Sequence, residues 1–305
     1  LVTWILLYFG SYKSLEKTLL VMVLFFSFMT MIIAIAMQST DYQVSAVQVS
    51  SGLSFSFPSG YLPLALAVFG FTGISYGEIM AYTYWCLEKG YAENSGNNVE
   101  ETKHWIKTMQ TDVWVTVFFI TLGTLPFFFL GAGVLYNIPE LQQSLATSSF
   151  WDIDVISSLQ NMFSLVLGGW AKWLFIILAF FVLFSTLLSG TAAFTRTISD
   201  YLISMGLVKE QANTRKKLIK LIAFLIPFLS GLFYFVLPNP FTLLLIAGIW
   251  AAMGLPIVNI GALYLVNKLE PELQPKVTTK LILWGSLVLQ LRLAVLIIDD
   301  ILLAF

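Results

Sequence analysis

Apolar residues gather into long runs along the chain, and short polar segments separate these runs. Positions 19–37, "LLVMVLFFSFMTMIIAIAM", show none of the polar–apolar alternation of a barrel strand. A helix needs roughly 20 apolar residues to cross a bilayer core about 30 Å thick, and in lipid only helices or closed barrels satisfy every backbone polar group. We therefore predict seven helical crossings, at about 18–38, 60–88, 111–137, 163–195, 218–237, 240–266 and 279–298.

The first residues form an apolar stub at 1–9, "LVTWILLYF", which is too short to cross a membrane. It has neither an initiator Met nor the charged region that opens a signal peptide. We expect it to be the end of an incomplete crossing, so that the chain lacks N-terminal helices. The pattern predicts an all-α polytopic membrane bundle, organised as one transmembrane domain over 1–305.

Lysine and arginine residues predict the orientation of the crossings, because short cytoplasmic loops carry an excess of them. They lie in every second connecting segment, which places the segments 39–59 and 138–162, without Lys or Arg, on the outer side. The Lys- and Arg-bearing segments are 10–17, 89–110, 196–217 and 267–280. We interpret the polar part of 89–110 as a surface helix, with His104 as a solvated residue.

Composition narrows the possible functions. The 305 residues are 58% hydrophobic and 11% charged, which is too apolar for an ordinary soluble domain. A net charge of −1 argues against nucleic acid as a partner. One cysteine, Cys86, and one histidine exclude an internal disulfide and multi-histidine or cysteine-cluster metal sites. We expect no enzyme activity and no cofactor, because the spans lack paired acids, a histidine or a Ser–Lys pair.

The stretch 70–90, "GFTGISYGEIMAYTYWCLEKG", predicts a broken helix inside a span. Gly70, Gly73 and Gly77 weaken a helix, each by up to about 1 kcal/mol relative to Ala. The hydroxyls of Thr72 and Ser75 can bond the released backbone groups, and such backbone lines a cavity in transporters. We predict unwinding at 73–77, within a binding segment at 72–78. Close packing through Gly73 and Gly77 is the alternative.

Glu78 lies in the same stretch, and an acid within a span is costly unless it is paired, protonated or hydrated. It is therefore a candidate ion ligand or proton carrier. The alternative is a neutral Glu78 that only bonds a neighbouring helix.

Three further groups of residues are candidates for the same cavity or for packing. Asn259 lies beside Pro256, which frees a backbone carbonyl, and can bond across helices. Small and hydroxyl residues gather in 163–195, where packing explains them equally well: Ser185, Ser189, Gly190 and Thr191. Arg292, with Asp299 and Asp300 further on, is interpreted as structural.

The chain resembles the Nramp family of divalent-metal transporters, and most closely its Nramp-related bacterial branch. The opening "YFGSYKSLEKTLLVMV" is similar to the start of the family's fifth helix, and "FTGISYGEIMAYTYWCLEKG" to its sixth. "LLLIAGIWAAMGLPIVNIGALYLVNK" is similar to its tenth, with the Leu255–Pro256 pair. The first three helices, including an ion-binding Asp and Asn, would then be absent from this sequence.

The resemblance implies a Leu-transporter-type inverted-repeat fold of the APC superfamily, in a bacterial plasma membrane, with proton-linked uptake of a divalent cation. Counting back from Glu88, Lys89 and Gly90, Ser75 falls where iron and manganese transporters carry a metal-binding methionine, and Thr72 falls at a carbonyl ligand. A hydroxyl in place of the thioether favours hard cations such as Mg²⁺ or Mn²⁺. Tyr76 and Gly248 depart from the family's proline and glutamine.

The leading hypothesis is thus a secondary transporter of a divalent metal ion (Mn²⁺, Mg²⁺ or Fe²⁺). The alternative is a Na⁺-coupled permease for an amino acid or another organic solute, since one fold hosts several substrates. The candidate metal-binding residues are Thr72, Gly73, Ser75, Tyr76, Glu78 and Asn259. The expected partners are the metal ion, protons and the bilayer.

Overall fold

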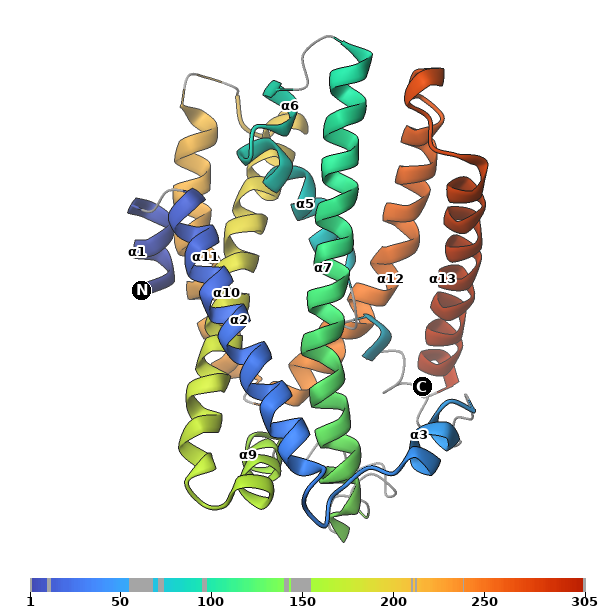
Figure 1. Cartoon of the computed structure of the whole chain (residues 1–305). Helices are drawn as coiled ribbons and strands as arrows, with labels where there is room; N and C mark the ends of the chain where they lie inside the picture. Colours follow the sequence, from blue (N-terminus) through green and yellow to red (C-terminus); the bar gives the residue numbers. More distant parts are fainter. Residues whose placement is uncertain are drawn as a thin grey trace. The chain divides into compact units, whose positions relative to one another are not determined.

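The computed structural model describes residues 2–9, 12–54, 68–70, 74–94, 98–139, 143, 155–209, 211, 213–237 and 239–303. Within these ranges the secondary structure is helical, as the apolar runs predict (Figure 1). The longer helices are α2 (Tyr12–Met37), α7 (Val99–Gly133), α10 (Ala171–Ser204), α11 (Thr214–Val236), α12 (Pro240–Val266) and α13 (Val277–Leu303). The shorter ones are α1 (Val2–Phe9), α3 (Ala46–Gly52), α5 (Tyr76–Glu88), α6 (Tyr91–Asn94), η1 (Leu135–Asn137), α9 (Val155–Leu167) and η3 (Pro271–Leu273).

Among the described residues, 6 helices are long and apolar enough to cross a membrane. They are α2, α7 and α10 to α13, and most of their surface is not covered by other parts of the protein. Large apolar side chains such as Ile35, Phe235 and Ile257 are exposed on them, which suits contact with lipid. The protein is an all-α, polytopic integral membrane protein. The predicted crossing at 60–88 falls partly outside the described residues.

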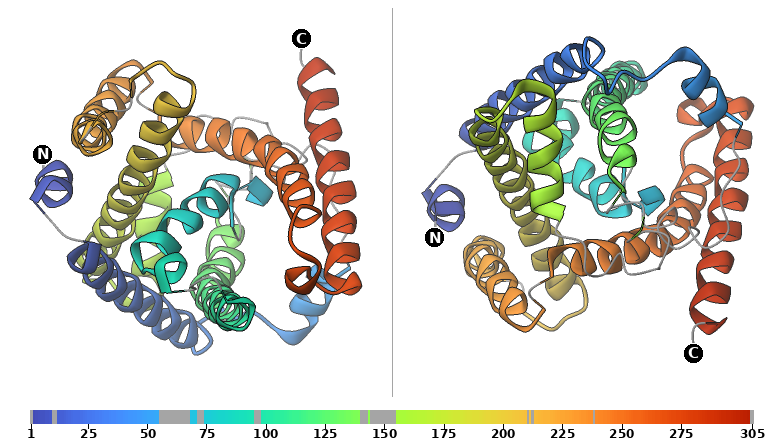
Figure 2. Two further views of the ribbon diagram at one scale, coloured as in Figure 1. Left: turned by 90° about the horizontal axis from the view of Figure 1, so that it is seen from above. Right: turned by 90° about the horizontal axis from the view of Figure 1, so that it is seen from below.

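The chain contains two compact units. Unit 1 combines Leu1–Ser56 with Phe119–Phe241, and α10 lies between α2 and α11 in it (Figure 2). Buried apolar residues of α2, α7, α9 and α10 form its core, with Phe163 and Phe175 at 5.4 Å between ring centroids. The stub α1 packs on α10 and α11.

We predicted one continuous helical crossing at 163–195, and this prediction is wrong in its bounds. Two separate helices occupy this stretch. α9 ends at Leu167, Gly168 adopts a φ of +88°, and α10 begins at Ala171. Only glycine takes this left-handed conformation at little cost, so the chain turns there despite an uninterrupted apolar run. Phe163 then packs against Phe175, and the two helices bury their apolar faces on each other.

The predicted crossing at 111–137 belongs to a longer helix, α7, which begins at Val99 and also contains the last part of the predicted surface segment. Asn98 begins it, since its side-chain oxygen accepts from the Glu100 N–H at 3.1 Å. Glu100 and Glu101 lie in the first turn, where negative charge is favourable. Positions 99–122 contain neither Pro nor Gly, so the polar surface segment continues into the apolar run as one helix.

Unit 2 combines Phe57–Phe118 with Thr242–Phe305, and so contains α5, α6, the first part of α7, α12 and α13. Ala252 of α12 is buried among Phe69 and two leucines of α13, Leu293 and Leu296. The helical residues 68–70 and α13 therefore both contact α12.

Candidate functional site

The helix of the predicted site stretch is broken. Residues 68–70 are helical, Ile74 and Ser75 are not, and α5 begins at Tyr76. Ser75 has extended backbone, with φ −75° and ψ 166°. Thr72 and Gly73 lie outside the described residues. The predicted unwinding at 73–77 extended too far, because Tyr76 and Gly77 are already helical.

Glu78 explains why the helix resumes so early. Its Oε2 accepts a hydrogen bond from the Ser75 backbone N–H at 2.5 Å, so the carboxylate caps the start of α5. A negative charge in the first turn also interacts favourably with the helix dipole. Glu78 is thus bonded within its own helix, where we had considered a neighbouring helix as the alternative. The side chain is exposed.

Both sides of the break pack directly on α12. A Cβ on Gly70 would lie 1.9 Å from the carbonyl oxygen of Gly248, and a Cβ on Gly254 would lie 2.5 Å from the Tyr76 ring. Such distances are too short for real side chains, so both glycines are needed for this close approach. The break is therefore held against α12 by backbone contact before it and by an aromatic ring after it.

Asn259, the candidate on α12, is 7% exposed and bonds across to α13. Its Nδ2 donates to Ser286 Oγ at 2.8 Å and to Gln290 Oε1 at 3.1 Å. Its Oδ1 is buried and has no hydrogen-bond partner among the residues that the structure describes. A buried polar atom left unpaired costs about 1–3 kcal/mol, so this oxygen is a candidate ligand atom.

The hydroxyl candidates on α10 mostly bond their own helix. Ser185 Oγ donates to the Val182 carbonyl at 3.0 Å, and Ser189 Oγ to that of Thr186 at 3.3 Å. Thr191 differs, since its buried Oγ1 has no hydrogen-bond partner within the described part of the chain. Local bonding and packing therefore account for Ser185 and Ser189.

The described residues contain no group of three or more His, Cys, Asp or Glu side chains that could hold a metal ion. His104 is exposed and packs edge-on against Trp105, as a solvated surface residue would. Among the predicted candidates that the structure describes, Ser75 offers a hydroxyl oxygen, Asn259 an amide oxygen and Glu78 a carboxylate. Such oxygen ligands suit hard cations.

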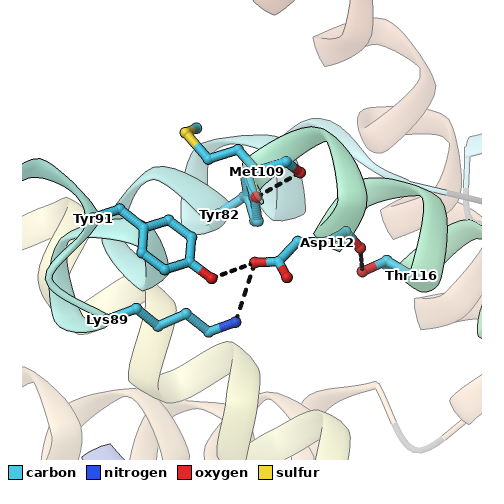
Figure 3. A network of polar contacts seen from close by, with 6 residues as sticks. All are labelled: Tyr82, Lys89, Tyr91, Met109, Asp112 and Thr116. Carbon is cyan, nitrogen blue, oxygen red and sulfur yellow. Dashed lines mark hydrogen bonds and ion pairs between the residues drawn. The ribbon is translucent and has the colours of Figure 1, made fainter. Parts of the chain in front are cut away.

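A polar network fixes the other end of α5 (Figure 3). Asp112 of α7 accepts from the Tyr91 hydroxyl at 2.7 Å and pairs with Lys89 at 3.3 Å. Tyr82 of α5 donates to the Met109 carbonyl at 3.2 Å. Burial, and after it the hydrogen bond to Asp112, raise the pKa of the Tyr91 hydroxyl above its ordinary value of 10.0. The end of α5 is therefore tied to α7 through the "EKG" segment.

Sequence reasoning missed three features of the candidate site: the helix start at Ser75 and the two partners of Asn259 on α13, Ser286 and Gln290. The pattern "SYGE" is a capping-box signature that predicts a helix start at Ser75, and it was readable from the sequence. Ser286 and Gln290 carry no local signal of their role, because their contact with Asn259 depends on how α13 packs on α12.

Neither the curated proteins nor the solved structures compared with the chain contain a match. The family model "Nramp: Natural resistance-associated macrophage protein-like" matches residues 1–299, which is nearly the whole chain. This match agrees with the set of long apolar helices among the described residues. The chain therefore belongs to the Nramp family.

Proposed function

We propose that this protein moves a hard divalent cation, Mg²⁺ or Mn²⁺ ahead of Fe²⁺, across a bacterial plasma membrane in a proton-linked cycle of alternating access. Nramp proteins are divalent-metal transporters and not enzymes, so family membership supports the metal over the Na⁺-coupled organic solute. The observation that carries the proposal is the break at Ile74 and Ser75, packed against α12. A broken helix offers backbone and side-chain oxygens to an ion within the membrane.

The proposed coordination sphere draws on both sides of this contact. Ser75 would offer its hydroxyl and Asn259 its unpaired Oδ1, while Tyr76 positions the start of α5 on Gly254. Thr72 and Gly73 would add oxygens from the segment just before Ile74. These are hard ligands, which supports Mg²⁺ or Mn²⁺ over softer metals.

Glu78 has a separate proposed role. Its carboxylate caps α5 through the Ser75 N–H, one residue from the break, so protonation would weaken this hydrogen bond. A proton arriving at Glu78 would thus loosen the helix start that carries Ser75. This supplies a direct physical link between proton and cation.

The test is cation uptake by the protein in sealed vesicles, with and without a pH gradient. We expect saturable uptake of Mn²⁺ and Mg²⁺, and a Ser75→Met variant that gains Cd²⁺ uptake relative to Mg²⁺, because a thioether is a soft ligand. Glu78→Gln should lose the acceleration by an inward proton gradient. The exposed serine of α11, Ser230, provides the matched control as Ser230→Ala.

Two results would overturn the proposal. One is Na⁺-driven uptake of an amino acid with no uptake of any divalent cation. The other is an unchanged metal preference in Ser75→Met together with an unchanged pH response in Glu78→Gln.

A further inference from the structure

The amide group of Asn259 is held on one side only. Its Nδ2 faces three oxygens of α13: Ser286 Oγ at 2.8 Å, Gln290 Oε1 at 3.1 Å and the Leu283 carbonyl at 3.4 Å. Its Oδ1 is buried and faces no hydrogen-bond donor of the described residues. The nitrogen of this amide is therefore hydrogen-bonded, whereas its oxygen is not.

The contacts on α13 determine which end is the nitrogen. The Leu283 carbonyl can only accept, and Ser286 gives its own proton to that carbonyl at 2.8 Å. Ser286 Oγ is left with lone pairs towards Asn259, so the Asn259 atom beside it has to donate. Only Nδ2 can do so, and Oδ1 must point away from these groups.

The position of Asn259 along α12 relates it to the broken helix. It follows Ala252 by about two helical turns, which places both on the same face of α12. Ala252 packs against Phe69, and Gly70 approaches the carbonyl of Gly248 one turn earlier on that face. The face of α12 that receives the helix before the break therefore also carries Asn259.

We infer that Ser286 and Gln290 are positioning residues, which bind the Asn259 nitrogen and so reserve its Oδ1 as a ligand for a hard divalent cation. The inference rests on the proposed function and adds two residues of α13 to it. An amide that could rotate would present its nitrogen to the cation in part of the molecules, and an N–H₂ group repels a metal ion. Partners that orient a ligand in this way affect metal affinity by about 10–100-fold.

The experiment measures Mn²⁺ uptake in vesicles, with KM and maximal rate obtained separately. We expect Ser286→Ala and Gln290→Met to raise KM about 10-fold while the maximal rate per folded protein changes little. Ser286→Thr keeps a hydroxyl and should restore the KM. Ser230→Ala removes a hydroxyl that bonds its own helix on α11, and should leave KM unchanged.

A double-mutant cycle with Asn259→Ala separates the possible outcomes. If Ser286 and Gln290 act through Asn259, then Gln290→Met will not raise KM further in the Asn259→Ala background. Gln290→Met completes this cycle even where Ser286→Ala fails to fold. An additive effect, or a wild-type KM for Gln290→Met beside a raised KM for Asn259→Ala, overturns the inference and leaves the proposed function standing. A wild-type KM for Asn259→Ala removes both the inference and the role of Asn259 in the proposed site.

Discussion

The chain leaves the helical conformation at Ile74–Ser75 and at Gly168–Gly169, and these two breaks are held in different ways. At Gly168 a positive φ of +88° reverses the chain, and aromatic packing between α9 and α10 closes the turn. At Ser75 the backbone is extended with negative φ, and glycine contacts press the flanking residues onto α12. A helix break with close backbone packing and polar caps is suited to a site, whereas a turn closed by phenylalanines is suited to a core.

The largest expected effect comes from Gly70. Its substitution by Ala would place a Cβ 1.9 Å from the Gly248 carbonyl oxygen, and a backbone atom cannot move aside as a flexible side chain can. We expect Gly70→Ala to lower the unfolding free energy by at least about 3 kcal/mol and to abolish metal uptake. Thermal unfolding in detergent, monitored together with vesicle uptake, is the measurement.

The matched control for this change is Gly261→Ala on α12. A Cβ at Gly261 meets nothing within 4 Å, so this variant should be neutral or more stable by up to about 1 kcal/mol. If Gly70→Ala and Gly261→Ala were equally stable, the close contact of Gly70 with α12 would not hold the break. The contrast between the break at Ser75 and the turn at Gly168 would then disappear.

A smaller effect is expected at Gly254, where the neighbour is a side chain. A Cβ there would lie 2.5 Å from the Tyr76 ring, which can shift at a cost of about 1–3 kcal/mol. Gly254→Ala should therefore destabilise the protein by this amount in thermal unfolding. Combining it with Tyr76→Ala should recover much of the stability, because the clash disappears; a purely additive loss would show that Tyr76 does not meet Gly254.

At the turn, a substitution of Gly168 should change stability through backbone conformation alone. Gly168→Ala meets nothing closer than a Trp170 carbon at 4.0 Å, so only the left-handed φ opposes the new side chain. We expect a loss of about 1–2 kcal/mol, without a change in KM for the metal. Gly169→Ala, which has free space and no positive φ, is the control. A raised KM in Gly168→Ala would mean that the turn also serves the site.

The contrast between the two points shows what could be predicted from the sequence. Apolar runs predict α12 well, since Pro240 begins the helix and its residues match the predicted 240–266. They do not separate α9 from α10, because hydropathy is the same on both sides of Gly168. Hydropathy alone does not show that α7 begins at Val99, since a polar segment can continue a helix beyond the apolar run.

The candidate site was predictable only in its local part. Glycines and hydroxyls indicated the break, and the Ser75–Glu78 pair marks its end through helix-capping chemistry. Asn259 was identified as a polar residue that can bond across helices. Its partners Ser286 and Gln290 were not, because contacts between distant segments leave no periodic or compositional signal in a single sequence.

The smallest effect concerns the far end of α5. A polar network holds this end against α7, as aromatic packing holds α9 against α10 at the turn. Tyr91 donates to Asp112 at 2.7 Å in a partly exposed position, so Tyr91→Phe should cost about 1 kcal/mol at neutral pH. Because the pKa of Tyr91 is raised in the folded protein, the neutral hydroxyl contributes stability below pH 10.0. That contribution is lost as the pH rises above this value, since the unfolded chain then ionises more readily.

The difference in unfolding temperature between the wild type and Tyr91→Phe should therefore be constant up to about pH 9 and shrink above about pH 10. Tyr234→Phe, at an exposed position on α11, corrects for the titration of other groups. A difference that stays constant at high pH would mean that the Tyr91 hydroxyl does not bond Asp112 in the folded protein. Other contacts of this end of α5, such as those of Lys89 and Tyr82, would then hold it, and the contrast with the aromatic turn would rest on the glycine contacts at the break.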